Sequence, residues 1–319
     1  MASTRDITRR IKSIKNTKKI TRAMEMVSAA KMRRAVASVL AIRPYAHSAW
    51  SVLTNLARSL KDHQTGLLEV RPVKSVLVVV VSSNKGLCGP FNSQLSKKIR
   101  EELRHPERLK VNLSGDKRIA SDISDQDLKI DFITIGKKGD AMIGKLGKDI
   151  IASFIDLCAL PSVEDVRPLV KIILDAYQAK KYDKVVVAYT DYISAISQQT
   201  KIRQILPISK IDLEKQIAEI DVHAQELGLE KPKSEYKVEP SPEMVLEHIV
   251  PRLMEMQIFH AVLESKASEE SARMLAMRNA TDAAGEMAAD LTFAFNQLRQ
   301  GKITQEISEI SAGRAALEN

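Results

Sequence analysis

The sequence predicts an α/β domain inserted between two long terminal helices that pack together as an antiparallel coiled coil. Three observations lead to this fold class. A seven-residue apolar repeat runs through the last eighty residues, which is typical of a helix lying along a partner helix. A basic segment without glycine fills the first sixty or so residues. Between them, aliphatic strand-like runs alternate with amphipathic helical runs, a pattern typical of a mostly parallel sheet.

The C-terminal segment 242–319 carries the strongest helical pattern of the chain. Thirteen of the sixteen positions in its stripe are apolar, the exceptions being His260, Glu270 and Thr281. Pro242 at the first helical position, after a serine as N-cap, marks the start. At roughly 1.5 Å per residue such a helix is on the order of 110 Å long. The rest of the chain is too small to bury it, so we expect much of it to project.

The charge distribution favours pairing of the two ends. The net charge is +9, but residues 1–61 carry +12 and the C-terminal segment carries −5. Two long helices of opposite sign suit each other as antiparallel partners. The predicted organisation is a coiled-coil helix at 1–62, an α/β domain at 72–208, a charged connector at 209–241 with a short helix, and a coiled-coil helix at 242–319.

The basic face of the N-terminal helix has three interpretations. It could be an organellar presequence, which is rich in arginine and poor in acids. It could bind nucleic acid, although no aromatic residue interleaves before Tyr45. It could also be a solvated face, with or without an acidic partner. The face consists of Arg9, Arg10, Lys12, Lys15, Lys18, Lys19, Arg22, Lys31, Arg33 and Arg34.

The central part has the alternation of a Rossmann-like domain. The segment 105–129 is polar with little periodicity, and is predicted to be a loop or a weak strand. Buried or alternating strands are predicted at 73–82, 130–135, 150–155, 184–190 and 199–207. Helices are predicted from the loop after the first strand to Arg104, after Gly139, and at 163–180.

No residue cluster in the sequence predicts catalysis, a metal site or a cofactor. The loop containing Gly86 and Gly89 follows a strand and precedes a helix, but it matches neither phosphate-binding glycine pattern. We therefore predict that it binds no nucleotide. Cys88 and Cys158 have no metal or disulfide spacing, which fits a reducing compartment. The longest aliphatic run, 76–81, is far too short to span a membrane.

Four blocks of the chain, in order, resemble the gamma subunit of F-type ATP synthase, and the resemblance covers essentially the whole length. These blocks are IKNTKKITRAMEMV at 14–27, GLCG at 86–89, SARMLAMRNATD at 271–282 and RQGKITQEISEI at 299–310.

The resemblance implies a rotor without chemistry of its own. Its terminal helices would form a shaft inside a ring of alpha and beta subunits, and its α/β domain would sit with the epsilon subunit on the membrane c-ring. Proton or sodium flow would turn the shaft and drive ATP synthesis, and the shaft would also regulate ATPase activity. A bacterial form is favoured, peripheral on the cytoplasmic face of the inner membrane. The competing function is a basic coiled-coil scaffold or nucleic-acid tether.

The resemblance also implies the residues that contact the catalytic ring. These are Arg299, Gln300, Thr304 and Glu306 on the C-terminal helix, which we expect to face Met24 on the N-terminal helix. The apolar stripe slips by one position between Leu298 and Ile303, so polar side chains should turn outward at this level. Two features depart from the family pattern. Arg314 places a charge near the expected tip of the shaft, and the connector is longer than in many members.

Overall fold

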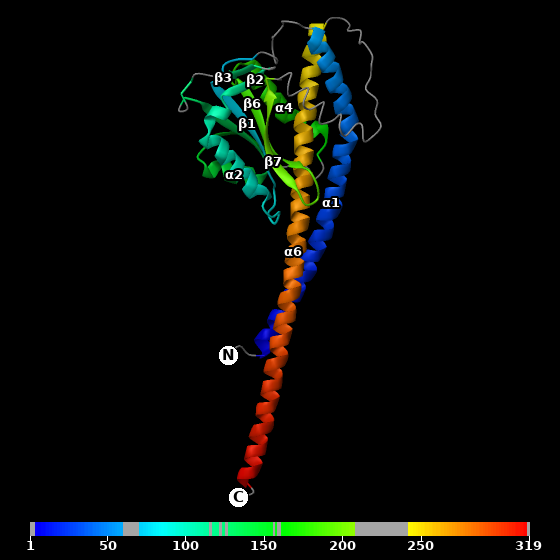
Figure 1. Cartoon of the computed structure of the whole chain (residues 1–319), viewed down its shortest axis with the longest axis vertical. Coiled ribbons are helices and arrows are strands. Elements are labelled where there is room, and N and C mark those ends of the chain that lie inside the picture. The colour runs from blue at the N-terminus through cyan, green and yellow to red at the C-terminus, as the bar shows by residue number, and fades with distance from the viewer. Residues whose placement is uncertain are drawn as a thin grey trace. The chain divides into compact units, whose positions relative to one another are not determined.

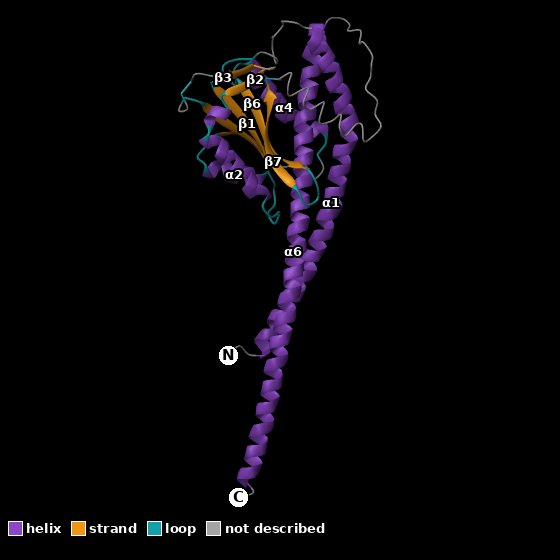
Figure 2. Cartoon of the chain, in the orientation of Figure 1, coloured by secondary structure: helices purple, strands orange, loops and turns teal. Residues whose placement is uncertain are grey.

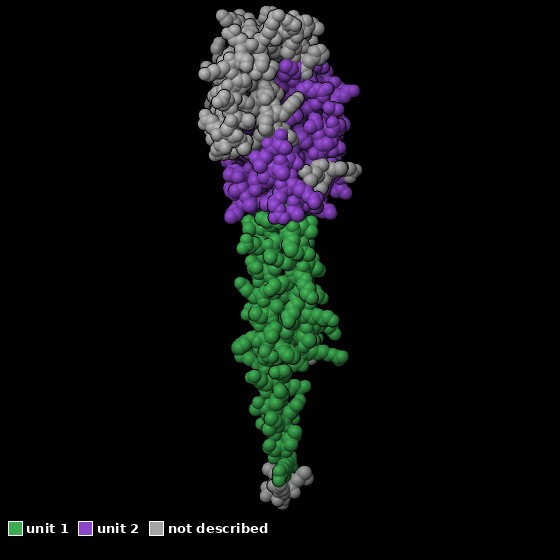
Figure 3. All heavy atoms as spheres, turned by 90° about the vertical axis from the view of Figure 1, so that its right-hand side faces the viewer, with its two compact units in different colours: residues 1–29, 273–319 green, residues 30–272 purple. Residues whose placement is uncertain are grey.

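The computed structural model contains two compact units. Unit 1 comprises residues 1–29 and 273–319, and unit 2 comprises residues 30–272 (Figure 3). The terminal helices α1 (Thr4–Ser59) and α6 (Pro242–Leu317) each contribute to both units. The structure describes residues 4–59, 70–114, 117–120, 123–124, 127–155, 157, 161–207 and 242–317.

A five-stranded sheet forms the centre of unit 2, with strand order β5-β4-β1-β6-β7 (Figure 2). The pairs β1–β4, β1–β6 and β4–β5 are parallel, and β6–β7 is antiparallel. The prediction of a mostly parallel sheet is therefore confirmed. The strands are β1 (Ser75–Val81), β4 (Lys129–Ile135), β5 (Ile150–Phe154), β6 (Lys184–Tyr192) and β7 (Gln198–Leu206).

Helices cover both faces of this sheet (Figure 1). On one face, α2 (Phe91–Arg104) and α3 (Lys137–Lys145) pack Leu95, Ile99 and Ile143 against the strands. On the other face, α4 (Val163–Gln178) shares an apolar core with the strands and with the early part of α6. Burial from both sides explains why β1 has the continuous aliphatic sequence SVLVVVV instead of an alternating one.

A small antiparallel hairpin, β2 (Val111–Ser114) with β3 (Lys117–Ala120), follows the 3-10 turn Pro106–Arg108. It lies where the sequence indicated a loop or a weak strand. Its strands have four residues each, too few for a clear two-residue period. The Lys184 ammonium donates to the Val111 carbonyl at 2.6 Å, which ties the hairpin to the main sheet.

The early part of α6 is a core helix of unit 2. Leu253, Met254, Ile258, Val262 and Leu263 are at most 2% exposed. Burying each such side chain contributes roughly 1.5–3 kcal/mol, so this part of α6 is held firmly against the domain. The helix continues through Pro251.

In unit 1, the first part of α1 lies along the second half of α6 and runs in the opposite direction. Thr21 lies beside Thr281, with their hydroxyl oxygens 2.8 Å apart, and both side chains are buried. Lys18 lies over Gly285, further along α6. Small residues such as Ala284 and Ala288 are buried here and allow the two helices to approach closely.

Several predictions fall on residues outside the described ranges. These include the short helix of the connector and Cys158. Within the described ranges, none of the helices is long and apolar enough to cross a membrane.

Candidate functional site

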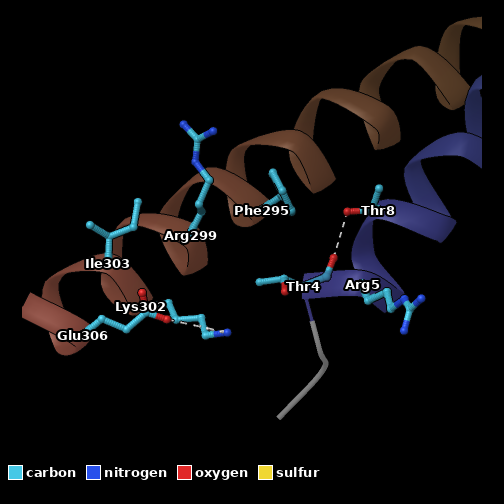
Figure 4. A pocket seen from close by; sticks show the side chains of 8 residues that line it. All are labelled: Thr4, Arg5, Thr8, Phe295, Arg299, Lys302, Ile303 and Glu306. Carbon is cyan, nitrogen blue, oxygen red and sulfur yellow. Dashed lines mark hydrogen bonds and ion pairs between the residues drawn. The ribbon is translucent and has the colours of Figure 1, made fainter. Parts of the chain in front are cut away.

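The candidate site lies in unit 1, where α1 begins beside α6. A pocket of about 310 Å³ opens between the two helices there (Figure 4). The first two turns of α1 and three turns of α6 contribute side chains to it. They are Thr4, Arg5, Thr8, Phe295, Arg299, Lys302, Ile303 and Glu306.

Polar and charged side chains dominate this pocket. The Thr8 hydroxyl donates to the Thr4 carbonyl at 2.9 Å, which keeps it within its own helix. Lys302 and Glu306 form an exposed ion pair at 3.9 Å. Arg299 extends away from α1 (Figure 4). Exposed charges on a rigid helix are available for pairing with another protein, and nothing in this geometry resembles a reaction centre.

Two of the predicted contact residues, Arg299 and Glu306, line the pocket. Gln300 and Thr304 are exposed on the same turns, and the Thr304 hydroxyl donates to the Gln300 carbonyl at 3.0 Å. These four residues therefore form one exposed polar segment of α6, which we call the 299–306 segment.

Met24 does not face this segment, so that part of the prediction is wrong. Met24 is within one turn of Thr21, and Thr21 lies beside Thr281. At 1.5 Å per residue, the eighteen residues from Thr281 to Arg299 span about 27 Å. The α1 residues beside Arg299 are Thr4, Arg5 and Thr8.

The pocket also contains residues that sequence reasoning missed, namely Thr4, Arg5, Thr8, Phe295 and Lys302. The predicted start of the N-terminal helix indicates which part of α6 lies beside it. The helix begins at Thr4, so in an antiparallel pair its first turn must lie beside a late part of α6. This helix start does not select the level on α6, because α6 continues to Leu317 and the apolar repeat allows several registers.

Large apolar side chains are exposed along the same part of α6. Phe293, Ile303, Ile307 and Ile310 are 47–72% exposed. Scattered exposed apolar residues are normal, but a row of them along one helix is typical of a surface that contacts another protein. Every described side chain from Asn296 to Arg314 is exposed, apolar as well as polar, so the outward turn of polar side chains after Leu298 stays a prediction.

In unit 2, the carboxyl edge of the sheet is the usual ligand position of a doubly wound fold. Here α6 lies across that edge. The Ser265 hydroxyl donates to the Val81 carbonyl at 3.4 Å, and the Ser268 hydroxyl donates to the Thr190 carbonyl at 3.2 Å. In the neighbouring loop, Cys88 is buried in a cluster with Phe91 and Ala272. A helix thus lies where a nucleotide would bind in other proteins of this fold.

Glu264 is a buried acid on α6 near the same edge. Burial, and to a smaller extent the nearby Asp191, raise its pKa to about 8, against the opposing effects of Arg203 and Lys201. His260, on the same helix, has its Nδ1 atom 3.5 Å from the Glu264 carboxyl oxygen. Glu264 is therefore mainly protonated at neutral pH in the folded chain.

The raised pKa makes stability depend on pH. Between about 4.5 and 8 the folded chain holds a proton on Glu264 that the unfolded chain releases, so the free energy of unfolding falls as pH rises. We expect Glu264→Gln to lose this dependence and to gain in Tm relative to the parent chain as pH rises from 5 to 9, because a neutral amide mimics the protonated acid. The exposed acid Glu286 provides the control, Glu286→Gln. Equal pH profiles of Tm for the parent chain and Glu264→Gln would contradict this account.

Fold and site together define a class of protein in which an α/β domain is inserted between two long terminal helices. Comparison with known proteins agrees with this class. A family model described as ATP synthase matches residues 3–317. The ATP synthase gamma chain of Roseiflexus castenholzii is 39% identical, with 99% of each chain covered. That of Heliobacterium modesticaldum is 37% identical, covering 99% of this chain and 100% of the relative. The chain belongs to the ATP synthase gamma chain family.

Solved structures show the same fold. A chain of the Euglena gracilis mitochondrial ATP synthase structure with OSCP, F1 and c-ring has a TM-score of 0.61 at 18% identity. That match covers 98% of this chain and 94% of the other. A chain of the Tetrahymena thermophila central stalk and c-ring structure has a TM-score of 0.54 at 24% identity, covering 82% and 99%.

Proposed function

We propose that this protein is the central rotor shaft of an F-type ATP synthase. Ion flow through a membrane ring turns the shaft, and the turning shaft drives ATP synthesis in a ring of alpha and beta subunits. The observation that carries the proposal is the long exposed end of α6 in a chain of this family. An exposed helix with alternating apolar and charged side chains is suited to turn inside a protein ring.

The shaft is an antiparallel, left-handed coiled coil of α1 and α6. The seven-residue repeat of the sequence supports this handedness. In unit 2, Lys31 and Glu270 lie 4.0 Å apart, as expected for a basic helix beside an acidic one. In unit 1, the Thr21–Thr281 hydroxyl pair lies between the helices.

A disulfide between the helices tests this pairing. We expect Thr21→Cys with Thr281→Cys to cross-link on mild oxidation, because the two hydroxyl oxygens are 2.8 Å apart. The cross-linked complex should keep its ATPase activity, since both helices turn as one body. Thr17, one turn from Thr21 and exposed, provides the control pair Thr17→Cys with Thr281→Cys. Absence of the first cross-link, or inhibition by it, would contradict the coiled coil.

The partners follow from the same role. The 299–306 segment and the exposed apolar row of α6 contact the alpha and beta subunits. The α/β domain contacts the epsilon subunit and the c-ring. The protein is peripheral, on the cytoplasmic face of a bacterial inner membrane, and the catalytic residues of the complex belong to other subunits.

Assembly with alpha and beta subunits tests the proposed function. Co-expression of the three chains should yield a complex that hydrolyses ATP, and omission of this chain should lower both its yield and its activity. A chain that stays apart from alpha and beta, and instead binds nucleic acid with a steep salt dependence, would favour the basic tether.

A further inference from the structure

Three serines on α6 are fully buried against the α/β domain. Ser265, Ser268 and Ser271 are 2%, 0% and 0% exposed. They are spaced three residues apart, so each lies next to the following one on the helix surface. We call them the serine row. A buried hydroxyl costs stability unless it is hydrogen-bonded, so three in succession require partners.

Each serine donates to a backbone carbonyl of the sheet or its hairpin. Ser265 reaches the Val81 carbonyl and Ser268 reaches the Thr190 carbonyl, as described above. Ser271 donates to the Ala195 carbonyl at 2.6 Å and accepts from the Gln198 side-chain amide at 3.3 Å. The row therefore joins α6 to the end of β1, to β6 and to the β6–β7 hairpin.

The position of these bonds in the sheet is informative. The parallel ladder between β1 and β6 ends with the pair Val80 and Ala188. Val81 and Thr190, whose carbonyls accept from the serine row, come just after this pair, while Val81 still pairs with Ile135 of β4 and Thr190 with Thr200 of β7. Buried carbonyls beyond the end of a ladder need other donors, and α6 supplies them.

The row also lies at the end of the contact between α6 and the domain. Unit 2 ends at Ala272, one residue after Ser271. The packed apolar side chains of α6, such as Leu253 and Leu263, also resist its rotation. The hydrogen bonds of the serine row have preferred angles and therefore add a directional constraint at this end of the contact.

We propose that the serine row is a rotational lock that transmits torque between the α/β domain and the shaft. This inference rests on the proposed rotor function. Torque from the membrane ring reaches the domain and must pass into α6 before the helix leaves unit 2. The lock makes the domain and α6 turn together, and these serines are positioning residues without a role in ATP chemistry.

The test uses the reconstituted complete ATP synthase carrying Ser265→Ala, Ser268→Ala and Ser271→Ala together. We expect assembly and ATP hydrolysis to stay within about twofold of the parent complex, while ions pumped per ATP hydrolysed fall about threefold or more, since each lost bond weakens the lock. The control is Ser38→Ala, which removes a hydroxyl bonded only within its own helix, to the Arg34 carbonyl. It should leave the ratio unchanged.

The outcomes separate the lock from a merely structural role. If the triple variant pumps as many ions per ATP hydrolysed as the parent complex, the proposed lock is wrong. It is also wrong if assembly, hydrolysis and pumping fall in parallel. If the triple variant fails to fold, Ser268→Ala alone decides the question. This variant should speed hydrogen exchange of the α6 amides near residue 268 about fivefold and lower the number of ions pumped per ATP hydrolysed. If both quantities equal those of the parent complex, the proposed lock is wrong. Failure of the parent chain to assemble with alpha and beta would instead reject the rotor function itself.

Discussion

Replacing Arg299 and Gln300 together by alanine is expected to leave the complex assembled and to lower ATP synthesis and hydrolysis severalfold. Both residues are exposed on the 299–306 segment, and Arg299 extends away from α1 (Figure 4). A charge-assisted contact with a ring subunit contributes on the order of 1–3 kcal/mol when partly desolvated. Losing about 1 kcal/mol from a rate-limiting transition state slows turnover roughly fivefold.

The same helix offers a matched control. Arg278 and Asn279 form an exposed pair of similar chemistry in unit 1, 21 residues before Arg299 and Gln300. We expect Arg278→Ala with Asn279→Ala to change turnover less than the first pair does. Both variants are measured on purified complexes of equal subunit content. Unchanged turnover after loss of Arg299 and Gln300 would show that the contact with the catalytic ring lies elsewhere on the shaft.

Gly136→Ala is expected to destabilise the α/β domain strongly. Gly136 follows β4 with φ of 96°, a conformation that side chains strongly disfavour. An added Cβ would lie 2.5 Å from the Ser82 carbonyl oxygen. The Ser82 hydroxyl itself donates to the Ile135 carbonyl at 2.8 Å and accepts from the Gly139 amide at 2.7 Å, so Ser82 cannot move freely.

Backbone strain and overpacking each cost about 1–3 kcal/mol. The sum, about 2–6 kcal/mol, corresponds to a fall in Tm of roughly 4–24 °C for a domain of this size. Gly144→Ala is the control, because no atom lies within 4 Å of its added Cβ and alanine favours a helix. Thermal unfolding of the two variants should differ in sign. A Tm for Gly136→Ala within about 1 °C of the parent would contradict the geometry.

The elements with long or strongly apolar patterns were predictable from the sequence. The limits of α1 and α6, and the strands β1 and β6, agree with the predicted ranges to within a few residues. A helix that is periodic over many turns can be recognised from its own sequence, and so can a strand buried on both faces, because the apolar pattern reflects which sides are buried. For the hairpin β2–β3 the sequence indicated only a loop or a weak strand, because four-residue strands show no such pattern.

The register between the two long helices was not predictable. A seven-residue repeat looks the same after one helix slides by seven residues along the other, so the apolar stripes alone do not select a partner for Arg299. The structure brings Thr4 and Arg5, not Met24, to that level. Buried polar contacts such as Thr21 with Thr281 can select one register, but their partners are recognisable only in three dimensions.

Rotation of this chain within an assembled ring tests the central claim most directly. A visible probe is attached to the α/β domain of the chain in a complex with alpha and beta subunits, and the ring is fixed to a surface. Addition of ATP should make the probe turn repeatedly in one direction, at a rate that follows ATP hydrolysis. A complex that hydrolyses ATP at full rate while the probe stays still would contradict the proposal that this protein is a rotor.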